Sequence, residues 1–142
     1  MPTSSASAVW EGGLKGGKGT FTAKSGAFKG DYSFATRFES APGTNPEELI
    51  AAAHAACLSM ALSLGLEQAG TPPTRISTTA HCTIDKADGG FRITTMRLEV
   101  RGQVPGIGQE QFQQAAEQAK NGCPVSNALK GNVKLELDAK LE

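Results

Sequence analysis

Residues 45–68 read Asn-Pro-Glu-Glu-Leu-Ile-Ala-Ala-Ala-His-Ala-Ala-Cys-Leu-Ser-Met-Ala-Leu-Ser-Leu-Gly-Leu-Glu-Gln. Asn45 is a favourable helix cap, and Pro46 suits the first helical position. Glu47 and Glu48 favour the positive end of a helix dipole. The stretch therefore predicts one long helix that starts at Pro46 and continues to about its last residue.

Apolar residues point in nearly every direction around this predicted helix, which indicates burial on most of its sides. A single small sheet would be poor cover for all of these faces. The helix also carries small residues that invite close approach of another backbone, namely Ala51, Ala52, Ala53, Ala55 and Ala56. We therefore expect a homodimer, in which the partner supplies the missing cover.

The segment before the helix is punctuated by glycine and is strand-like. Residues 8–38 predict a small antiparallel sheet, whose last strand covers residues 32–38. One face of that strand is formed by Tyr32, Phe34, Thr36 and Phe38, which places Arg37 on the opposite face. Arg37 is therefore not an ordinary core-facing residue.

The segments after the helix predict a hairpin, two more helices and a closing strand. Residues 75–104 form the hairpin, with its turn at residues 88–90, and a change in apolar parity indicates a bulge near Thr94 and Thr95 or a strand buried on both faces. Residues 109–120 predict a polar helix, Cys123 caps a short one, and residues 133–137 alternate as a strand. This order predicts a single α+β domain over residues 1–142.

The composition disfavours several classes of function. Lys plus Arg and Asp plus Glu each number 14 in the 142 residues, so the formal net charge is zero and no basic field would attract nucleic acid. The first residues do not resemble a secretory signal, and no run is expected to span a bilayer. We expect a cytoplasmic protein with neither nucleic-acid nor membrane partners.

The three cysteines are an odd number at low density, which argues against a disulfide scaffold and leaves reactive or inert thiols as the alternatives. Cys57 lies inside the predicted long helix, and Cys123 lies at the start of a short one. Thiols in these two positions could serve as the attacking and resolving sulfurs of a peroxide-reducing centre. This pairing is our working hypothesis.

Cys57 needs a nearby cation to act as a nucleophile, because its ordinary pKa is about 8.5 and burial raises it further. Lowering that pKa by ~2 units requires roughly 2.7 kcal/mol of preferential stabilisation of the anion, which one guanidinium could supply. Arg37 is the candidate cation, and Glu47 could hold it in place. Because Glu47 lies about 15 Å from Cys57 along one helix, we favour a Glu47 from the partner chain.

The expected cycle uses both thiols. Cys57 attacks a peroxide and releases an alcohol, its sulfenic acid condenses with Cys123, and an external dithiol reopens the disulfide. The free N–H groups at a helix start would stabilise the thiolate of Cys123. The apolar neighbours of Cys57 favour an organic hydroperoxide over hydrogen peroxide.

Each candidate residue also has a simpler interpretation. Cys57 could be a small buried hydrophobe, Cys82 an inert core residue, and His81 a solvated one. His54 could be a base, a packed histidine bonded to a carbonyl or carboxylate, or a zinc ligand with Cys57 and Cys123, although no paired metal motif is present. At the level of the whole chain, the alternative is a non-catalytic module that binds a small hydrophobe at a dimer interface.

Four segments together resemble the OsmC/Ohr family, and in particular its osmotically inducible protein C branch. They are Thr-Arg-Phe-Glu at 36–39, Gly-Thr-Asn-Pro-Glu-Glu-Leu at 43–49, His-Ala-Ala-Cys at 54–57 and Gly-Cys-Pro-Val-Ser at 122–126. The resemblance covers nearly the whole chain, and the combined motifs are far more specific than any one of them.

The resemblance implies a thiol-dependent peroxidase that acts on organic hydroperoxides in oxidative or osmotic stress. In it, Cys57 matches the peroxidatic cysteine, Cys123 the resolving one, and Arg37 and Glu47 the activating pair. It further implies an intertwined α+β homodimer whose central helices are wrapped by antiparallel sheets, with active sites at the subunit interface. It implies no metal or prosthetic cofactor, and reduction by a lipoyl-type dithiol or a lipoylated protein.

Overall fold

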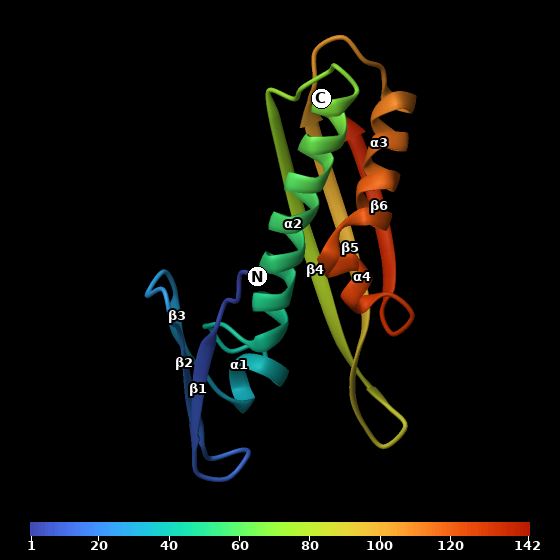
Figure 1. Cartoon of the computed structure of the whole chain (residues 1–142). Helices are drawn as coiled ribbons and strands as arrows, with labels where there is room; N and C mark the ends of the chain where they lie inside the picture. Colours follow the sequence, from blue (N-terminus) through green and yellow to red (C-terminus); the bar gives the residue numbers. More distant parts are fainter. The chain divides into compact units, whose positions relative to one another are not determined.

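The computed structural model describes all 142 residues and divides into two compact units, residues 1–49 and 50–142 (Figure 1). The α+β class predicted from the sequence is confirmed. In chain order, the elements are β1 (Ala6–Glu11), β2 (Lys18–Ala23), β3 (Lys29–Tyr32), α1 (Phe34–Phe38), α2 (Pro46–Gln68), β4 (Arg75–Ala87), β5 (Gly90–Gln103), α3 (Gln109–Gly122), α4 (Pro124–Leu129) and β6 (Lys134–Leu141).

The first unit contains the predicted small antiparallel sheet, in the order β1-β2-β3. Its aromatic side chains form one cluster, in which the ring of Tyr32 lies 5.5 Å from that of Trp10 and 6.0 Å from that of Phe21. Gly19 lies beneath this cluster, because a Cβ there would come within 2.6 Å of the Tyr32 ring and 2.7 Å of Trp10. The glycine therefore allows the rings to pack directly on the strand.

The prediction that the third strand continues to residue 38 is wrong, because the chain turns into the helix α1 after Tyr32. Ser33 and Thr36 form a reciprocal capping box, in which the Ser33 N–H donates to Thr36 Oγ1 at 2.9 Å and the Thr36 N–H donates to Ser33 Oγ at 3.2 Å. These two bonds satisfy helix-start donors that a strand pattern does not reveal. Arg37 thus lies in the last turn of a short helix.

The long helix α2 has the start predicted for it. Asn45 Oδ1 accepts a hydrogen bond from the Glu48 N–H at 2.8 Å, and Asn45 Nδ2 donates to the carbonyl of Thr36 at 3.0 Å. One side chain therefore caps α2 and also ties it to α1 within the first unit.

The second unit contains the predicted hairpin of β4 and β5. Asp88 and Gly89 form its turn, with positive φ values of 49° and 80°, as a two-residue hairpin turn requires. The register shifts where Thr83 pairs with Thr95 and Ile84 pairs with Ile93, so Thr94 is the extra residue of a bulge. The bulge predicted near Thr94 and Thr95 is therefore confirmed.

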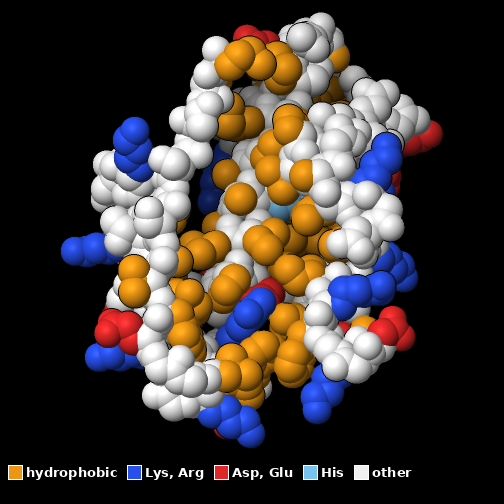
Figure 2. Space-filling view, turned by 60° about the horizontal axis from the view of Figure 1, so that its bottom comes forward, with side chains coloured by type: hydrophobic (Ala, Val, Ile, Leu, Met, Phe, Trp, Pro, Cys, Tyr) orange, Lys and Arg blue, Asp and Glu red, His pale blue; other side chains and the backbone are white.

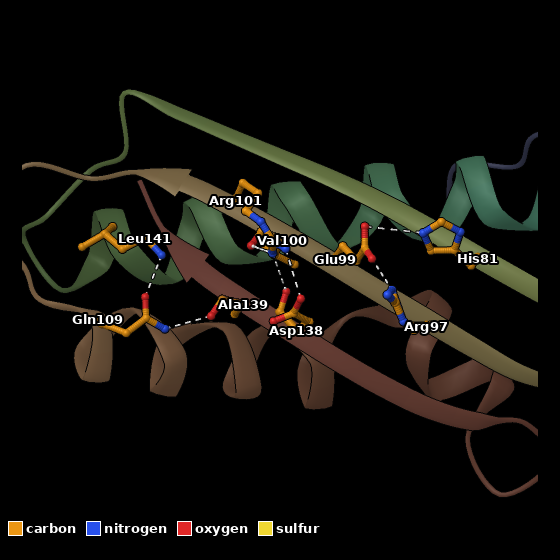
Figure 3. Close-up of polar contacts among 9 residues, drawn as sticks. All are labelled: His81, Arg97, Glu99, Val100, Arg101, Gln109, Asp138, Ala139 and Leu141. Carbon is orange, nitrogen blue, oxygen red and sulfur yellow. Dashed lines mark hydrogen bonds and ion pairs between the residues drawn. The ribbon is translucent and has the colours of Figure 1, made fainter.

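The closing strand β6 is parallel to β5, which corrects the expectation of purely antiparallel sheets. The reason is that α3 and α4 form a crossover that returns the chain to the same end of the sheet. Gln109, at the start of α3, extends the hydrogen bonding of β6, since its amide donates to the Ala139 carbonyl at 2.8 Å and accepts from the Leu141 N–H at 2.7 Å (Figure 3).

Charged side chains pair across the polar face of this second sheet (Figure 3). Arg101 Nη2 lies 3.0 Å from Asp138 Oδ2, and Glu99 pairs with both Arg97 and His81. His81 is exposed, as predicted. Exposed pairs of this kind contribute little to stability, and they mark the solvent side of the sheet.

The core lies on the other face of the second sheet and is formed with α2 and α3. Its fully buried members include Leu58, Leu62 and Leu66 of α2, Met96, Leu98 and Val100 of β5, and Phe112 of α3. The leucines are four residues apart and form a single stripe along α2. One face of the helix thus faces this core.

The opposite side of α2 is exposed, so the prediction that the helix is buried on most sides is wrong for the single chain. Met60 is 76% exposed and Leu64 is 54% exposed, and Ala52, Ala53 and Ala56 are also exposed. Hydrophobic side chains are visible on the surface in Figure 2. The alanine-rich side of α2 is an apolar surface of this kind.

α2 is also long and apolar enough to cross a membrane by length and composition, with a mean hydropathy of 1.9. This corrects the expectation that no run could span a bilayer. The central helix of a water-soluble domain passes the same test, so the property by itself assigns no membrane.

Candidate active site

The structure brings together the two cysteines that the sequence singled out. Cys57, in the middle of α2, and Cys123, at the start of α4, have their sulfur atoms 2.9 Å apart. Cys57 is half-buried, and Cys123 is fully buried. A disulfide bond is about 2.05 Å long, so the two sulfurs need to approach by only about 1 Å to form one.

The break between α3 and α4 fixes the position of Cys123. Its N–H donates to the Ala119 carbonyl at 2.8 Å and so ends α3, while its carbonyl accepts from the Asn127 N–H at 3.0 Å and so begins α4. Pro124 occupies the first turn of α4, where its missing N–H costs nothing. The prediction that Cys123 caps a short helix is confirmed for the backbone.

The two thiols have opposite electrostatic surroundings. Burial raises the pKa of Cys57, and its hydrogen bond with Cys123 raises it further. Burial also opposes ionisation of Cys123, but its hydrogen bond with Cys57 and those from the Ser126 N–H and hydroxyl and the Val125 N–H outweigh it and lower the pKa. Within the second unit, hydrogen bonding thus lowers the pKa of Cys123 while burial raises that of Cys57, in line with the expectation that Cys57 needs an added cation to be held as the anion.

A buried histidine and serine lie beside the thiol pair. His54 Nε2 is 2.7 Å from Ser126 Oγ, and both residues are almost completely buried, at 0% and 1% exposure. Burial lowers the pKa of His54, and its Nδ1 has no hydrogen-bond partner. The sequence predicted a carbonyl or carboxylate partner for His54, and the partner is a hydroxyl instead.

Ser126 is a residue of this site that sequence reasoning missed. It lies three residues after Cys123, in the first turn of α4, and its N–H and hydroxyl both hydrogen-bond the Cys123 sulfur. That spacing was visible in the sequence, although a serine in a short helix carries no strong signal by itself.

The other two candidate residues, Arg37 and Glu47, form a pair within the first unit. Arg37 Nη2 lies 2.8 Å from Glu47 Oε1, and Arg37 Nε donates to Oε1 at 2.9 Å and to Oε2 at 3.2 Å. The Glu47 side chain is 6% exposed and that of Arg37 is 36% exposed. Within the chain the partner of Arg37 is thus its own Glu47. That a second chain supplies the Glu47 of the Cys57 site stays a prediction.

This forked contact positions a guanidinium firmly, because two donors bind one carboxylate. Arg37 also lies over the ring of Phe38, 5.2 Å from its centre. The pair joins the last turn of α1 to the first turn of α2.

Two alternatives from the sequence concern Cys82 and a metal. Cys82 lies on β4 and packs against the core of the second unit, in agreement with the core interpretation. No group of three or more His, Cys, Asp and Glu side chains in the structure is arranged to hold a metal ion. The zinc site that His54, Cys57 and Cys123 could have formed therefore has no support in the geometry.

Known proteins match both the sequence and the fold. Peroxiredoxin OsmC of Escherichia coli (strain K12) is 52% identical over 134 residues, which cover 94% of each chain. An organic hydroperoxide resistance protein of Xanthomonas axonopodis pv. citri (strain 306) is 35% identical over 96 residues, which cover 67% of this chain and 66% of that protein. The crystal structure of an organic hydroperoxide resistance protein from Elizabethkingia anophelis aligns with a TM-score of 0.81 at 28% identity and covers 100% of this chain and 98% of that one.

A model of the family described as OsmC-like protein matches residues 39–138. This range contains Glu47, Cys57 and Cys123, whereas Arg37 lies just before it. The resemblance noted from the sequence motifs is confirmed, and the chain belongs to the OsmC-like protein family.

Proposed function

We propose that this chain is a thiol-dependent peroxidase that reduces organic hydroperoxides to alcohols in oxidative or osmotic stress. The observation that carries the proposal is the 2.9 Å separation of the Cys57 and Cys123 sulfurs. It is supported by the names of the relatives, which include a peroxiredoxin and organic hydroperoxide resistance proteins. Two thiols at this distance can pass between a dithiol and a disulfide without a rearrangement of the helices.

In the proposed reaction, Cys57 is the peroxidatic residue because it is the more accessible of the two sulfurs. Its thiolate attacks the terminal oxygen of the hydroperoxide, the O–O bond breaks, and the alkoxide takes up a proton and leaves as an alcohol. Cys57 is then a sulfenic acid. Cys123 attacks that sulfur, an S–S bond forms, and the S–O bond breaks with loss of water. An external dithiol reduces the disulfide.

Arg37 and Glu47 are proposed as the activating pair for the Cys57 thiolate. The support is that the surroundings of Cys57 in its own unit raise its pKa, so a peroxidatic role requires an added cation. Arg37 is held in a fork by Glu47 and would present its guanidinium with little loss of side-chain freedom. The cationic charge would stabilise the anion at the moment of attack.

The proposed assembly is a homodimer that covers the exposed apolar side of α2. Ala52, Ala53, Ala56, Met60 and Leu64 leave this side of a central helix open to solvent in the single chain. A second copy of the same surface is a self-complementary cover for small residues. We further propose a cytoplasmic location and a lipoyl-type dithiol, free or protein-bound, as the reductant.

The function is tested by following peroxide consumption with a dithiol donor, comparing tert-butyl hydroperoxide with hydrogen peroxide. The proposal predicts turnover of both, with a clear preference for the alkyl hydroperoxide. It also predicts that Cys57→Ser abolishes turnover while Cys82→Ser retains it. Equal turnover in wild type and Cys57→Ser would contradict the proposal.

A binding function is the second candidate, and one observation favours it. A groove of about 340 Å³ lies between α2 and α3, with apolar walls that include Leu64, Leu66 and Ala115. Such a groove could hold a small hydrophobic molecule. This alternative predicts binding of an apolar ligand that is unchanged in Cys57→Ser, together with no consumption of peroxide by the wild type.

A further inference from the structure

His54 and Ser126 form a second connection between α2 and α4, parallel to the thiol pair. His54 lies three residues before Cys57 on α2, and Ser126 lies three residues after Cys123 at the start of α4. The His54 Nε2 to Ser126 Oγ distance is 2.7 Å, and both side chains are excluded from solvent. The proposed reaction as described so far gives neither residue a role.

The unpaired Nδ1 of His54 indicates which ring nitrogen carries the proton. If Nδ1 carried it, a buried N–H donor would have no acceptor, which is rare and costly in folded proteins. If Nε2 carries it, Nε2–H donates to Ser126 Oγ and Nδ1 keeps a lone pair, which is the less costly arrangement. A protonated imidazolium would leave the same unpaired N–H on Nδ1, so the geometry favours the neutral Nε2–H form.

This tautomer determines where the Ser126 hydroxyl donates. When Ser126 Oγ accepts from His54, its own hydrogen is free to point toward the other neighbour, the sulfur of Cys123. In the opposite tautomer the hydroxyl hydrogen would be directed to His54 and Cys123 would lose a donor. The titratable group next to Cys123 is Cys57 on α2, and the remaining donors come from Ser126 and Val125 of α4.

We propose that His54 is a positioning residue that acts through Ser126 on Cys123, in a hydrogen-bonded chain that runs from His54 Nε2–H to Ser126 Oγ–H to the Cys123 sulfur. The chain prepares Cys123 for its attack on oxidised Cys57, and in this respect the inference rests on the proposed function. In that step the Cys123–Cys57 S–S bond forms and the S–O bond of the sulfenic acid breaks. The departing hydroxide and the proton given up by Cys123 leave as water.

The first test measures the ionisation of Cys123 without any peroxide. In a Cys57→Ser background, the rate of iodoacetamide labelling of the Cys123 peptide is followed by mass spectrometry as a function of pH, which separates Cys123 from Cys82. The pH at which the labelling rate is half-maximal is the midpoint of this profile. Loss of one hydrogen bond to the thiolate in Ser126→Ala should raise the midpoint by about one pH unit. His54→Leu should raise the midpoint by part of that shift. His54→Gln, which keeps a donor near the position of Nε2, should return the midpoint to its value with His54 present.

The matched control is Ser59→Ala. Ser59 also lies on α2 and bonds a hydroxyl, that of Thr78, at 2.8 Å, but it is not part of the chain to Cys123. This variant should leave the midpoint unchanged. If Ser126→Ala lowers only the thermal stability and leaves the midpoint where it was, the pair merely joins two helices and the proposal is wrong.

The second test uses the unmodified reduced protein and so does not depend on the folding of any variant. The ¹⁵N and ¹H correlations of the His54 ring should show the Nε2–H tautomer across neutral pH. A ring protonated at Nδ1 would overturn the proposal, because Ser126 would then donate to His54.

The third test addresses the resolving step. After one equivalent of tert-butyl hydroperoxide, the Cys57 sulfenic acid trapped by dimedone should live roughly tenfold longer in Ser126→Ala than in wild type. A lifetime equal to that of wild type would overturn the role in resolution. If wild type forms no sulfenic acid at all, the proposed function fails, while the labelling and tautomer measurements still decide whether the hydrogen-bonded chain exists.

Discussion

The middle of α2 and the start of α4 give the same residue type opposite properties. Around Cys57 the N–H groups of α2 are used within the helix, and burial outweighs the hydrogen bond from the Val125 N–H, so the pKa of the thiol is raised. Around Cys123 burial also opposes ionisation, but the hydrogen bond with Cys57, the first N–H groups of α4 and the Ser126 hydroxyl together lower the pKa. Position within a helix therefore shifts the pKa values of the two thiols in opposite directions within this unit.

This difference suggests a division of labour between the two thiols. A thiol whose anion is stabilised by its surroundings is suited to resolving a sulfenic acid, since a lower pKa increases the fraction of thiolate available for the attack. A thiol in the middle of a helix needs a cation from outside its immediate surroundings to become an attacking group. The forked pair of Arg37 and Glu47 is the candidate source of that cation.

The largest expected effect comes from removing either sulfur of the Cys57–Cys123 pair. Cys57→Ser should lower peroxide consumption by at least about a thousandfold, because the nucleophile is lost. Cys123→Ser should still consume one equivalent and then stop with a trapped sulfenic acid. Stopped-flow peroxide consumption with dimedone trapping distinguishes these two results. Identical behaviour of both variants would contradict the assignment of Cys57 as the attacking thiol and Cys123 as the resolving one.

A second prediction concerns the packing that holds Cys57 in place. Leu62 is fully buried on the core side of α2, so Leu62→Ala should lower the free energy of unfolding by about 2–5 kcal/mol. Leu64 lies on the exposed side, and Leu64→Asp should leave the fold intact while converting the proposed dimer to monomer. Urea titration measures the free energy of unfolding of Leu62→Ala, and analytical ultracentrifugation measures the mass of Leu64→Asp in solution. A Leu64→Asp protein with an unchanged mass in solution would argue against a dimer through this side of α2.

A third prediction sharpens the contrast between the two thiols by removing the cation. Arg37→Met should raise the pKa of Cys57 and lower the rate of its oxidation by up to about a hundredfold, with little effect on Cys123. Arg37→Lys keeps the charge but loses the forked contact with Glu47, so its Cys57 oxidation rate should lie between those of wild type and Arg37→Met. Peptide-resolved alkylation against pH provides the measurement. An unchanged Cys57 profile in Arg37→Met would exclude Arg37 from the site.

The smallest expected effect is the pH dependence that His54 gives to stability. Burial holds the pKa of folded His54 below the value of about 6.5 for an exposed histidine, so the unfolded chain takes up a proton first as the pH falls. The contribution of His54 to stability is therefore complete above about pH 6.5 and decreases below it. Urea unfolding at several pH values between neutral and mildly acidic gives the free energy of unfolding as a function of pH. This free energy should fall less steeply with decreasing pH in His54→Gln than in wild type. An identical pH dependence would show that His54 does not titrate in this way.

Much of the fold was predictable because local signals agree with it. Asn45 and Pro46 mark the start of α2, Asp88 and Gly89 mark the hairpin turn, and the change of parity marks the bulge at Thr94. The segment after Tyr32 was not, because alternating aromatic residues imitate a strand and only the Ser33–Thr36 capping box reveals the helix. The parallel direction of β6 depends on the crossover through α3 and α4, which no single segment specifies.

The candidate site was predictable in its residues more than in its chemistry. The motifs indicated both cysteines, and the structure places their sulfurs together. The sequence did not show that hydrogen bonding lowers the pKa of Cys123, because this depends on donors that meet only after α4 forms beside α2. The partner of His54 was hidden for the same reason, since Ser126 lies 72 residues away in the chain.

If Cys57 and Cys123 act as one redox pair, a single oxidation should join them, and mass analysis of peptides detects that link. The reduced protein is treated with one equivalent of tert-butyl hydroperoxide, its remaining thiols are blocked, and it is digested without reductant. The account predicts one linked peptide that joins Cys57 to Cys123, with Cys82 blocked as a thiol. Recovery of Cys57 and Cys123 in separate peptides, with the peroxide consumed, would contradict it.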